Sequence, residues 1–79
     1  MTVRTNAVTN TSTISVSCNS GEKAVGGGGT SSNLSNRDVS ESLPLNGASP
    51  AVSGDTPDGW RFSINGGNAN LTAYVLCAS

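Results

Sequence analysis

Two cysteines constrain the fold of this chain most, because each one ends a segment with the alternating pattern of a β-strand. The segments are residues 13–18, ending at Cys18, and residues 71–77, ending at Cys77. Side chains alternate between the two faces of a strand, so each cysteine should share a face with every second residue before it. Those residues are apolar: Ile14 and Val16 in the first segment, and Leu71, Ala73 and Val75 in the second. The pattern predicts two core-facing strands whose thiols are well placed to bond.

A Cys18–Cys77 disulfide is the favoured state of the two thiols, and two free, buried cysteines are the alternative. The bond would close a loop of about 59 residues and stabilise the fold by roughly 4 kcal/mol in the chain-entropy model. Disulfides persist in oxidising compartments. A bonded pair therefore predicts a domain that works outside the cytosol, in an extracellular protein or in a virion.

The supply of core residues is small for a chain of 79 residues, since Leu, Ile, Val and Phe together number 15. Disordered chains combine low hydropathy with high net charge, whereas the net charge here is only −1. We therefore expect a single folded domain over residues 1–79 that is stabilised by the disulfide and by association of copies. The N-terminal residues lack the apolar segment of a signal peptide, so we expect a domain of a longer protein, with a small cytosolic protein as the alternative.

Turn residues and β-branched residues dominate the sequence, and no segment has a sustained helical period. We expect an all-β fold, a small antiparallel sandwich or barrel-like domain of five or six short strands. Residues 1–11 form a lead-in or an edge strand in this scheme, and residues 12–78 form the β core. The further strand candidates are residues 13–18, 22–25, 39–45, 60–64 and 71–77, with polar or glycine- and proline-rich loops over 30–38 and 48–59.

Two turn signals predict which strands pair. Asn19-Ser20-Gly21 separates the first two strand candidates and would join them as a hairpin. Asn65-Gly66-Gly67-Asn68 contains the Asn-Gly pair that is the strongest short hairpin signal. We therefore predict a C-terminal hairpin over residues 60–77. Pro44 and the following Asn46-Gly47 are expected to end the third strand.

The glycine run from Gly26 to Gly29 raises the question of a phosphate-binding loop. A P-loop needs Lys and then Ser or Thr after its last glycine, whereas Thr30 follows here, and no helix is expected next. The favoured interpretation is structural: Gly26, Gly27, Gly28 and Gly29 let a bulky group, such as Trp60, or another chain approach the backbone closely. No cofactor is expected.

The acidic and aromatic residues offer few candidates for chemistry. Asp55 and Asp58 share one loop and could form a weak calcium site, although capping of turns is the favoured role and no metal is expected. Trp60 and Tyr74, together with Asp55 and Asp58, could contact a surface ligand such as a glycan. Trp60 otherwise fills the core, and Tyr74 is exposed or lies in a subunit interface. Glu41 lies on a solvated face or pairs across strands with Arg37, Arg61 or Lys23. The chain contains no His that could activate a nucleophile, so we do not expect an enzyme.

Four motifs together resemble a small domain of bacterial secreted proteins and of phage tail or collagen-like fibre proteins. They are Ser15-Val16-Ser17-Cys18, Ser20-Gly21-Glu22-Lys23-Ala24-Val25-Gly26-Gly27-Gly28, Gly59-Trp60 and Leu71-Thr72-Ala73-Tyr74-Val75-Leu76-Cys77-Ala78. The resemblance covers about residues 12 to 78. The chain departs from the pattern at Asn19, where proline is common.

The resemblance implies a structural module of an extracellular fibre or virion, whose role would be to trimerise and hold three chains in register. The expected partners are further copies of the chain. The alternative is an extracellular module that binds a carbohydrate or a cell surface, with a host glycan as its partner. The near-neutral charge gives no electrostatic attraction for nucleic acid, and no apolar run is long enough to span a membrane.

Overall fold

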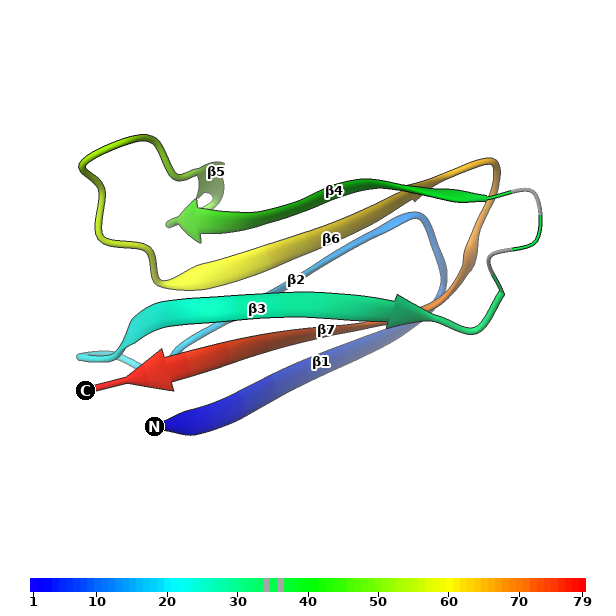
Figure 1. Ribbon diagram of the computed structural model, residues 1–79. Helices are drawn as coiled ribbons and strands as arrows, with labels where there is room; N and C mark the ends of the chain where they lie inside the picture. The colour runs from blue at the N-terminus through cyan, green and yellow to red at the C-terminus, as the bar shows by residue number, and fades with distance from the viewer. Residues whose placement is uncertain (34, 36) are drawn as a thin grey trace.

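The computed structural model describes residues 1–33, 35 and 37–79, and it is all-β, as the sequence predicts (Figure 1). The described residues form seven strands, one more than the upper expectation, because a two-residue strand lies in the predicted 48–59 loop. The strands are β1 (Thr2–Thr11), β2 (Thr13–Ser17), β3 (Lys23–Ser31), β4 (Asp38–Asn46), β5 (Ser49–Pro50), β6 (Gly59–Asn65) and β7 (Ala69–Ala78). The described part of the chain holds no helix long and apolar enough to cross a membrane.

Two antiparallel sheets form the molecule. The three-stranded sheet has the order β1-β7-β3, and the four-stranded sheet has the order β2-β6-β4-β5. They stack into an elongated sandwich of 37 × 23 × 15 Å, and both chain termini lie at the same end (Figure 1). Register explains the position of the termini, because Thr2 at the start of β1 lies opposite Cys77 near the end of β7.

The core lies between the sheets and follows the predicted alternation. On β7 every second residue is buried, and on β2 only Ile14 and Val16 are buried. Phe62 and Ile64 of β6 complete the centre from the opposite sheet. The core cluster consists of Ile14, Val16, Ala24, Phe62, Ile64, Ala69, Leu71, Ala73, Val75 and Cys77. Most of these residues are small, so the buried apolar volume is modest.

The predicted C-terminal hairpin over residues 60–77 is wrong, although both of its strands exist. β6 lies in the four-stranded sheet between β2 and β4, whereas β7 lies in the three-stranded sheet between β1 and β3. Residues 66–68 therefore carry the chain from one sheet to the other, with Gly66 and Gly67 at positive φ. A hairpin would place the two apolar faces side by side in one sheet, whereas this arch places them face to face across the core.

The predicted hairpin of residues 13–18 and 22–25 is wrong for the same reason. β2 pairs with β6 and β3 pairs with β7, so the Asn19–Glu22 turn also crosses between sheets. The backbone N–H of Glu22 donates to the Asn19 carbonyl at 3.0 Å, and Gly21 has a positive φ of 87°. The turn itself was therefore predicted correctly, but the pairing of its flanking strands was not.

Three smaller features refine the expected boundaries. Residues 1–11 form an edge strand and not a lead-in, since β1 pairs with β7 along most of its length. β4 continues beyond Pro44, whose carbonyl accepts a hydrogen bond from the Ala51 N–H on the side away from β6. The expected 30–38 loop overlaps the end of β3, and within it Leu34 and Asn36 lie outside the described residues.

The glycine run forms part of β3, where it allows two aromatic rings to rest on the strand. A Cβ atom on Gly27 would lie 2.5 Å from Cδ2 of Trp60, and one on Gly29 would lie 2.2 Å from Cγ of Phe62. Real side chains do not approach so closely, so these two positions require glycine for steric reasons. The expected approach of Trp60 to the glycine run is therefore present, together with a second contact from Phe62.

The glycine contacts predict different effects for two neighbouring substitutions. Gly29→Ala should lower the free energy of unfolding by about 2–3 kcal/mol, because its methyl group would overpack the core against Phe62. Gly28→Ala is the matched control, since a Cβ there meets no atom within 4 Å, and it should change stability by less than about 0.5 kcal/mol. Urea denaturation in dilute solution measures both, and equal stability of the two variants would contradict the packing argument.

Candidate functional site

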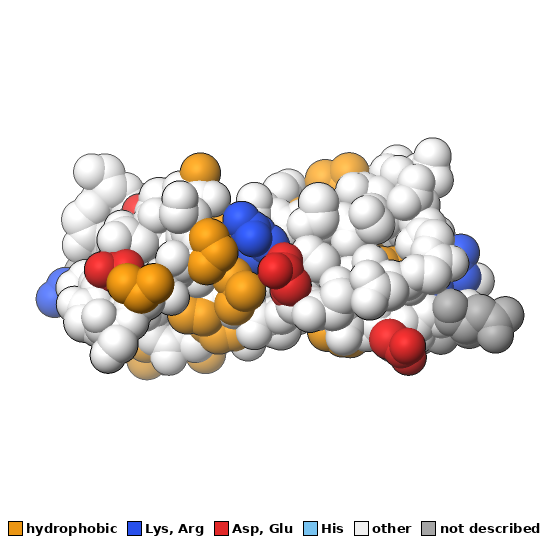
Figure 2. All heavy atoms as spheres, turned by 90° about the horizontal axis from the view of Figure 1, so that it is seen from above, with side chains coloured by type: hydrophobic (Ala, Val, Ile, Leu, Met, Phe, Trp, Pro, Cys, Tyr) orange, Lys and Arg blue, Asp and Glu red, His pale blue; other side chains and the backbone are white. Residues whose placement is uncertain are grey.

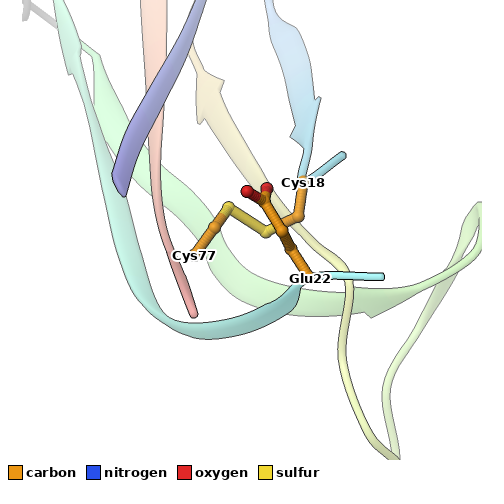
Figure 3. A group of neighbouring side chains, drawn as sticks. All are labelled: Cys18, Glu22 and Cys77. Carbon is orange, nitrogen blue, oxygen red and sulfur yellow. A yellow bond between two sulfur atoms is a disulfide. The ribbon is translucent and has the colours of Figure 1, made fainter. Parts of the chain in front are cut away.

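The end of the sandwich that carries both termini is closed by the predicted Cys18–Cys77 disulfide (Figure 3). The two sulfur atoms lie 2.03 Å apart and the two Cα atoms 5.8 Å apart. Cys18 follows β2 of the four-stranded sheet, and Cys77 lies on β7 of the three-stranded sheet. The bond therefore joins the two sheets, and it is compatible with an extracellular location.

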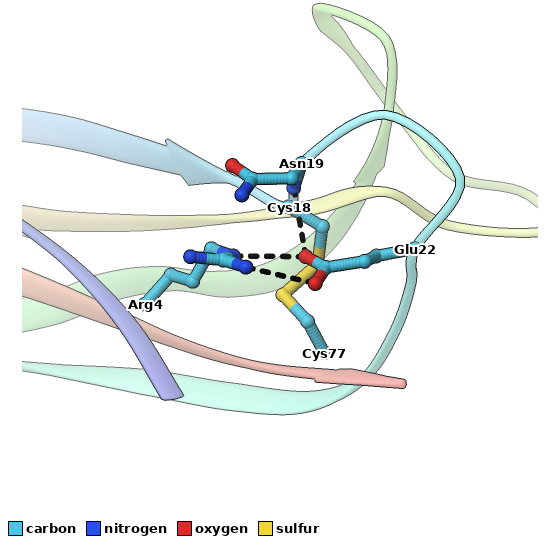
Figure 4. A network of polar contacts seen from close by, with 5 residues as sticks. All are labelled: Arg4, Cys18, Asn19, Glu22 and Cys77. Carbon is cyan, nitrogen blue, oxygen red and sulfur yellow. Dashed lines mark hydrogen bonds and ion pairs between the residues drawn. A yellow bond between two sulfur atoms is a disulfide. The ribbon is translucent and has the colours of Figure 1, made fainter. Parts of the chain in front are cut away.

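An ion pair lies beside the disulfide at the same end (Figure 4). Nε and Nη2 of Arg4 donate to the two carboxylate oxygens of Glu22, each at 2.8 Å. The Asn19 backbone N–H donates to Oε1 of Glu22 at 2.9 Å. These contacts tie the start of β1 to the turn between β2 and β3. Sequence reasoning missed the pair, because 18 positions separate its members and neither belongs to a recognisable charge pattern.

The hydrogen bonds from Arg4 shift the acidity of Glu22. They lower the pKa of Glu22 from its ordinary value of 4.5 to about 2, with a smaller contribution in the same direction from the Asn19 N–H. Both interactions stabilise the charged carboxylate and thereby oppose its protonation. Glu22 therefore remains ionised well below the usual range of a glutamate.

Cys18, Glu22 and Cys77 form the one group in the described residues whose atoms lie close enough to hold a metal ion (Figure 3). Cysteine binds metals as a thiolate, which sulfurs bonded to each other do not provide. The Glu22 carboxylate is already held by Arg4. The arrangement therefore serves to join segments of the chain and does not provide a metal site in the oxidised protein.

Asp55 and Asp58 serve separate turns. Oδ2 of Asp55 accepts a hydrogen bond from the Val52 N–H at 3.0 Å. Oδ1 of Asp58 accepts one from the Gly47 N–H, also at 3.0 Å. These are the turn-capping roles that the sequence favours over a calcium site.

The two aromatic candidates lie on different surfaces. Trp60 packs against the core, and its Nε1 donates to Oγ of Ser42 at 3.0 Å. Its polar edge is therefore engaged within the fold. Tyr74 points away from the core on β7 and is 41% exposed. Of the two, Tyr74 is the one positioned to contact a second molecule.

Tyr74 belongs to the outer face of the three-stranded sheet, which is nearly free of charge. In the described residues, Lys23 is the one basic or acidic side chain at the register positions of this face. Val3, Tyr74 and Leu76 form an exposed apolar strip on it, with Val3 directly opposite Leu76. The face comprises Val3, Thr5 and Ala7 of β1, Thr72, Tyr74, Leu76 and Ala78 of β7, and Lys23, Gly26, Gly28 and Thr30 of β3.

The four-stranded sheet carries a different kind of surface, an open groove of about 610 Å³ beside β2. Nη1 of Arg61 lies 3.5 Å from Oε1 of Glu41, and Ser63 lies within hydrogen-bond distance of both Glu41 and Thr13. Figure 2 looks down on the side of β4 and β5, where basic and acidic side chains meet near the middle of a mostly uncharged surface. The groove is lined by Asn6, Val8, Thr13, Ile14, Ser15, Glu41 and Arg61.

Comparison with known proteins finds no matching family model, no matching curated protein and no matching solved structure.

The low pKa of Glu22 predicts how stability depends on pH. The folded state binds its proton only near pH 2, whereas the unfolded chain binds it near pH 4.5, so the ion pair stabilises the fold fully above pH 4.5 and loses this effect as the pH falls toward 2. Glu22→Gln should therefore be less stable than the unchanged protein at pH 7, and the difference should shrink between pH 4.5 and 2. Urea denaturation across this range measures it; a difference independent of pH would contradict the assignment.

Proposed function

We propose that the domain is a structural assembly module, a homotrimeric tip of a fibrous extracellular or virion protein. The observation that carries the proposal is the exposed apolar strip of Val3, Tyr74 and Leu76 on a sheet face with almost no charge. Burial of such a face between copies would add apolar contacts to a fold whose own core consists mostly of small side chains. The resemblance to fibre-associated domains supports the same role.

The position of the termini also supports a tip. Both ends of the chain lie at the disulfide end of the sandwich (Figure 1). A stalk that continued from the N-terminus would therefore leave the module at this end alone. Three modules arranged around an axis parallel to their strands would bring three such stalks together in register.

Association can be measured directly by size-exclusion chromatography with light scattering, where we expect a mass three times that of the chain. Tyr74→Asp should weaken the trimer by at least about a hundredfold, because an unpaired charge buried in an interface costs about 3 kcal/mol or more. Val52→Asp is the matched control, since Val52 is 68% exposed in a loop away from this face, and it should remain trimeric. A monomer at micromolar concentration would overturn the proposal.

A second candidate function is the binding of a saccharide, which the groove beside β2 favours. Its lining combines the amide of Asn6, the hydroxyl groups of Thr13 and Ser15, and the Glu41–Arg61 pair. Such groups can donate hydrogen bonds to sugar hydroxyl groups and accept hydrogen bonds from them. This candidate would make the module a surface-binding element in place of, or in addition to, an assembly element.

A glycan array tests the groove. The unchanged protein should bind a subset of saccharides, and Arg61→Ala should weaken that binding by about tenfold or more through the loss of charged hydrogen bonds. Lys23→Ala removes a cation that does not line the groove and serves as the control. An array without bound saccharides, or equal effects of the two substitutions, would count against this second function.

A further inference from the structure

The two sheets differ in how their edges are protected. An edge strand presents unpaired backbone groups that can pair with another chain, and proteins usually cover them. In the four-stranded sheet, the Ser15 carbonyl accepts a hydrogen bond from Nδ2 of Asn6 at 2.9 Å, and the Thr13 carbonyl accepts one from Oγ1 of Thr11 at 2.9 Å. At the other edge of this sheet, β5 pairs with Leu45 and Asn46 at the end of β4, and the preceding Pro44 has no N–H to offer.

The three-stranded sheet leaves both of its edges open, apart from the start of β3, where the Ala24 N–H donates to the Pro57 carbonyl at 2.9 Å. Neighbouring antiparallel strands exchange backbone hydrogen bonds at every second residue. The Ser32 N–H donates to the Asn70 carbonyl at 2.9 Å, so the even-numbered residues of β3 that precede Ser32 in the same register also bond to β7. The odd-numbered residues between them, Gly27 and Gly29, therefore direct their N–H and C=O groups away from β7. The described part of the chain provides no hydrogen-bond partner for these groups.

The same alternation fixes the outer edge of β1. The even-numbered residues of β7 bond to β3, so its odd-numbered residues bond to β1. Val3, Thr5 and Ala7 lie opposite even-numbered residues of β7. Their backbone N–H and C=O groups therefore face away from β7, toward the open side of the sheet. All three residues are exposed, and their backbone groups likewise find no partner in the described residues. Each copy thus carries two open edges of similar length, with no charged side chain at these positions.

We propose that β1 of one copy pairs with β3 of the next copy, so that three copies close into a ring of nine strands, three from each copy. This inference rests on the proposed trimer and assigns its interface. β1 and β3 run in the same direction because both are antiparallel to β7. In a ring whose three-fold axis follows the strands, the pairing between copies is parallel. A head-to-tail interface of this kind uses both open edges of every copy and leaves none exposed.

The side chains at the two edges fit each other. Val3 projects from β1 on the outer face and is 56% exposed. On β3, Gly28 has no side chain, and a Cβ there would meet no atom within 4 Å. The partner's β1 would therefore bring branched side chains next to a strand that has room for them. The outer faces would then line the inside of the ring, so that the apolar strip with Tyr74 becomes buried.

Amide hydrogen exchange followed by NMR tests the pairing. In the trimer, the amides of Val3, Thr5, Ala7, Gly27 and Gly29 should exchange at least about tenfold more slowly than in the diluted monomer. A trimer in which these amides exchange as fast as exposed loop amides would overturn the edge pairing while leaving the proposed assembly role intact. A protein that stays monomeric would overturn both.

A substitution on β1 provides a second, independent measurement. Thr5→Pro removes an N–H that faces away from β7, so it should leave the β1–β7 hydrogen bonds in place while blocking the pairing between copies. We expect a folded monomer with an intact disulfide. Thr5→Val is the control, and it should remain trimeric. A Thr5→Pro variant that is folded and trimeric would contradict the pairing; if the variant does not fold, the exchange experiment decides.

Discussion

The Cys18–Cys77 disulfide is the covalent constraint on which the rest of the structure depends. The connections after β1, β2, β3 and β6 all cross between the sheets. Each strand pairs within its own sheet, so the two layers are held together by packing of a small core. The disulfide fixes one end of this packing, and the Arg4–Glu22 pair fixes β1 and the Asn19–Glu22 turn at the same end. Toward the middle, the Trp60 and Phe62 rings rest on glycines, which sets how closely the layers approach.

The alternation of side chains made the strands predictable but not their partners. Ile14, Val16 and the odd-numbered residues of β7 are buried as the pattern requires. The same pattern describes a strand in a hairpin and a strand in an arch, because both bury one face. The Asn65-Gly66 signal therefore identified a turn and gave the wrong pairing for it. The disulfide was predictable because both cysteines lie on core-facing positions, whereas the Arg4–Glu22 pair depends on the crossing of the β2–β3 turn, which no local pattern encodes.

The candidate residues for ligand contact fall into two groups, those whose polar groups already form hydrogen bonds within the fold and those that remain exposed. Trp60, Asp55 and Asp58 make hydrogen bonds that hold loops and strands in place, and the glycine run serves as the surface on which the aromatic rings pack. Tyr74 is left on an outer face, where it is accompanied by Val3 and Leu76. The alternation of side chains predicted that Tyr74 lies on the face opposite Cys77. That Val3 belongs to the same apolar strip follows from the β1–β7 register, which only the structure provides.

The central position of β7 has a consequence for the order of folding. β1 and β3 do not pair with each other, and each depends on β7 for its hydrogen bonds. During synthesis, the first strand of the chain must therefore wait for the last one before the three-stranded sheet can form. Pairing of such distant segments makes folding slow, because the entropy of closing the long loop is lost before the contacts form. The oxidation that joins Cys18 to Cys77 can then act as a late step that locks an already completed sheet.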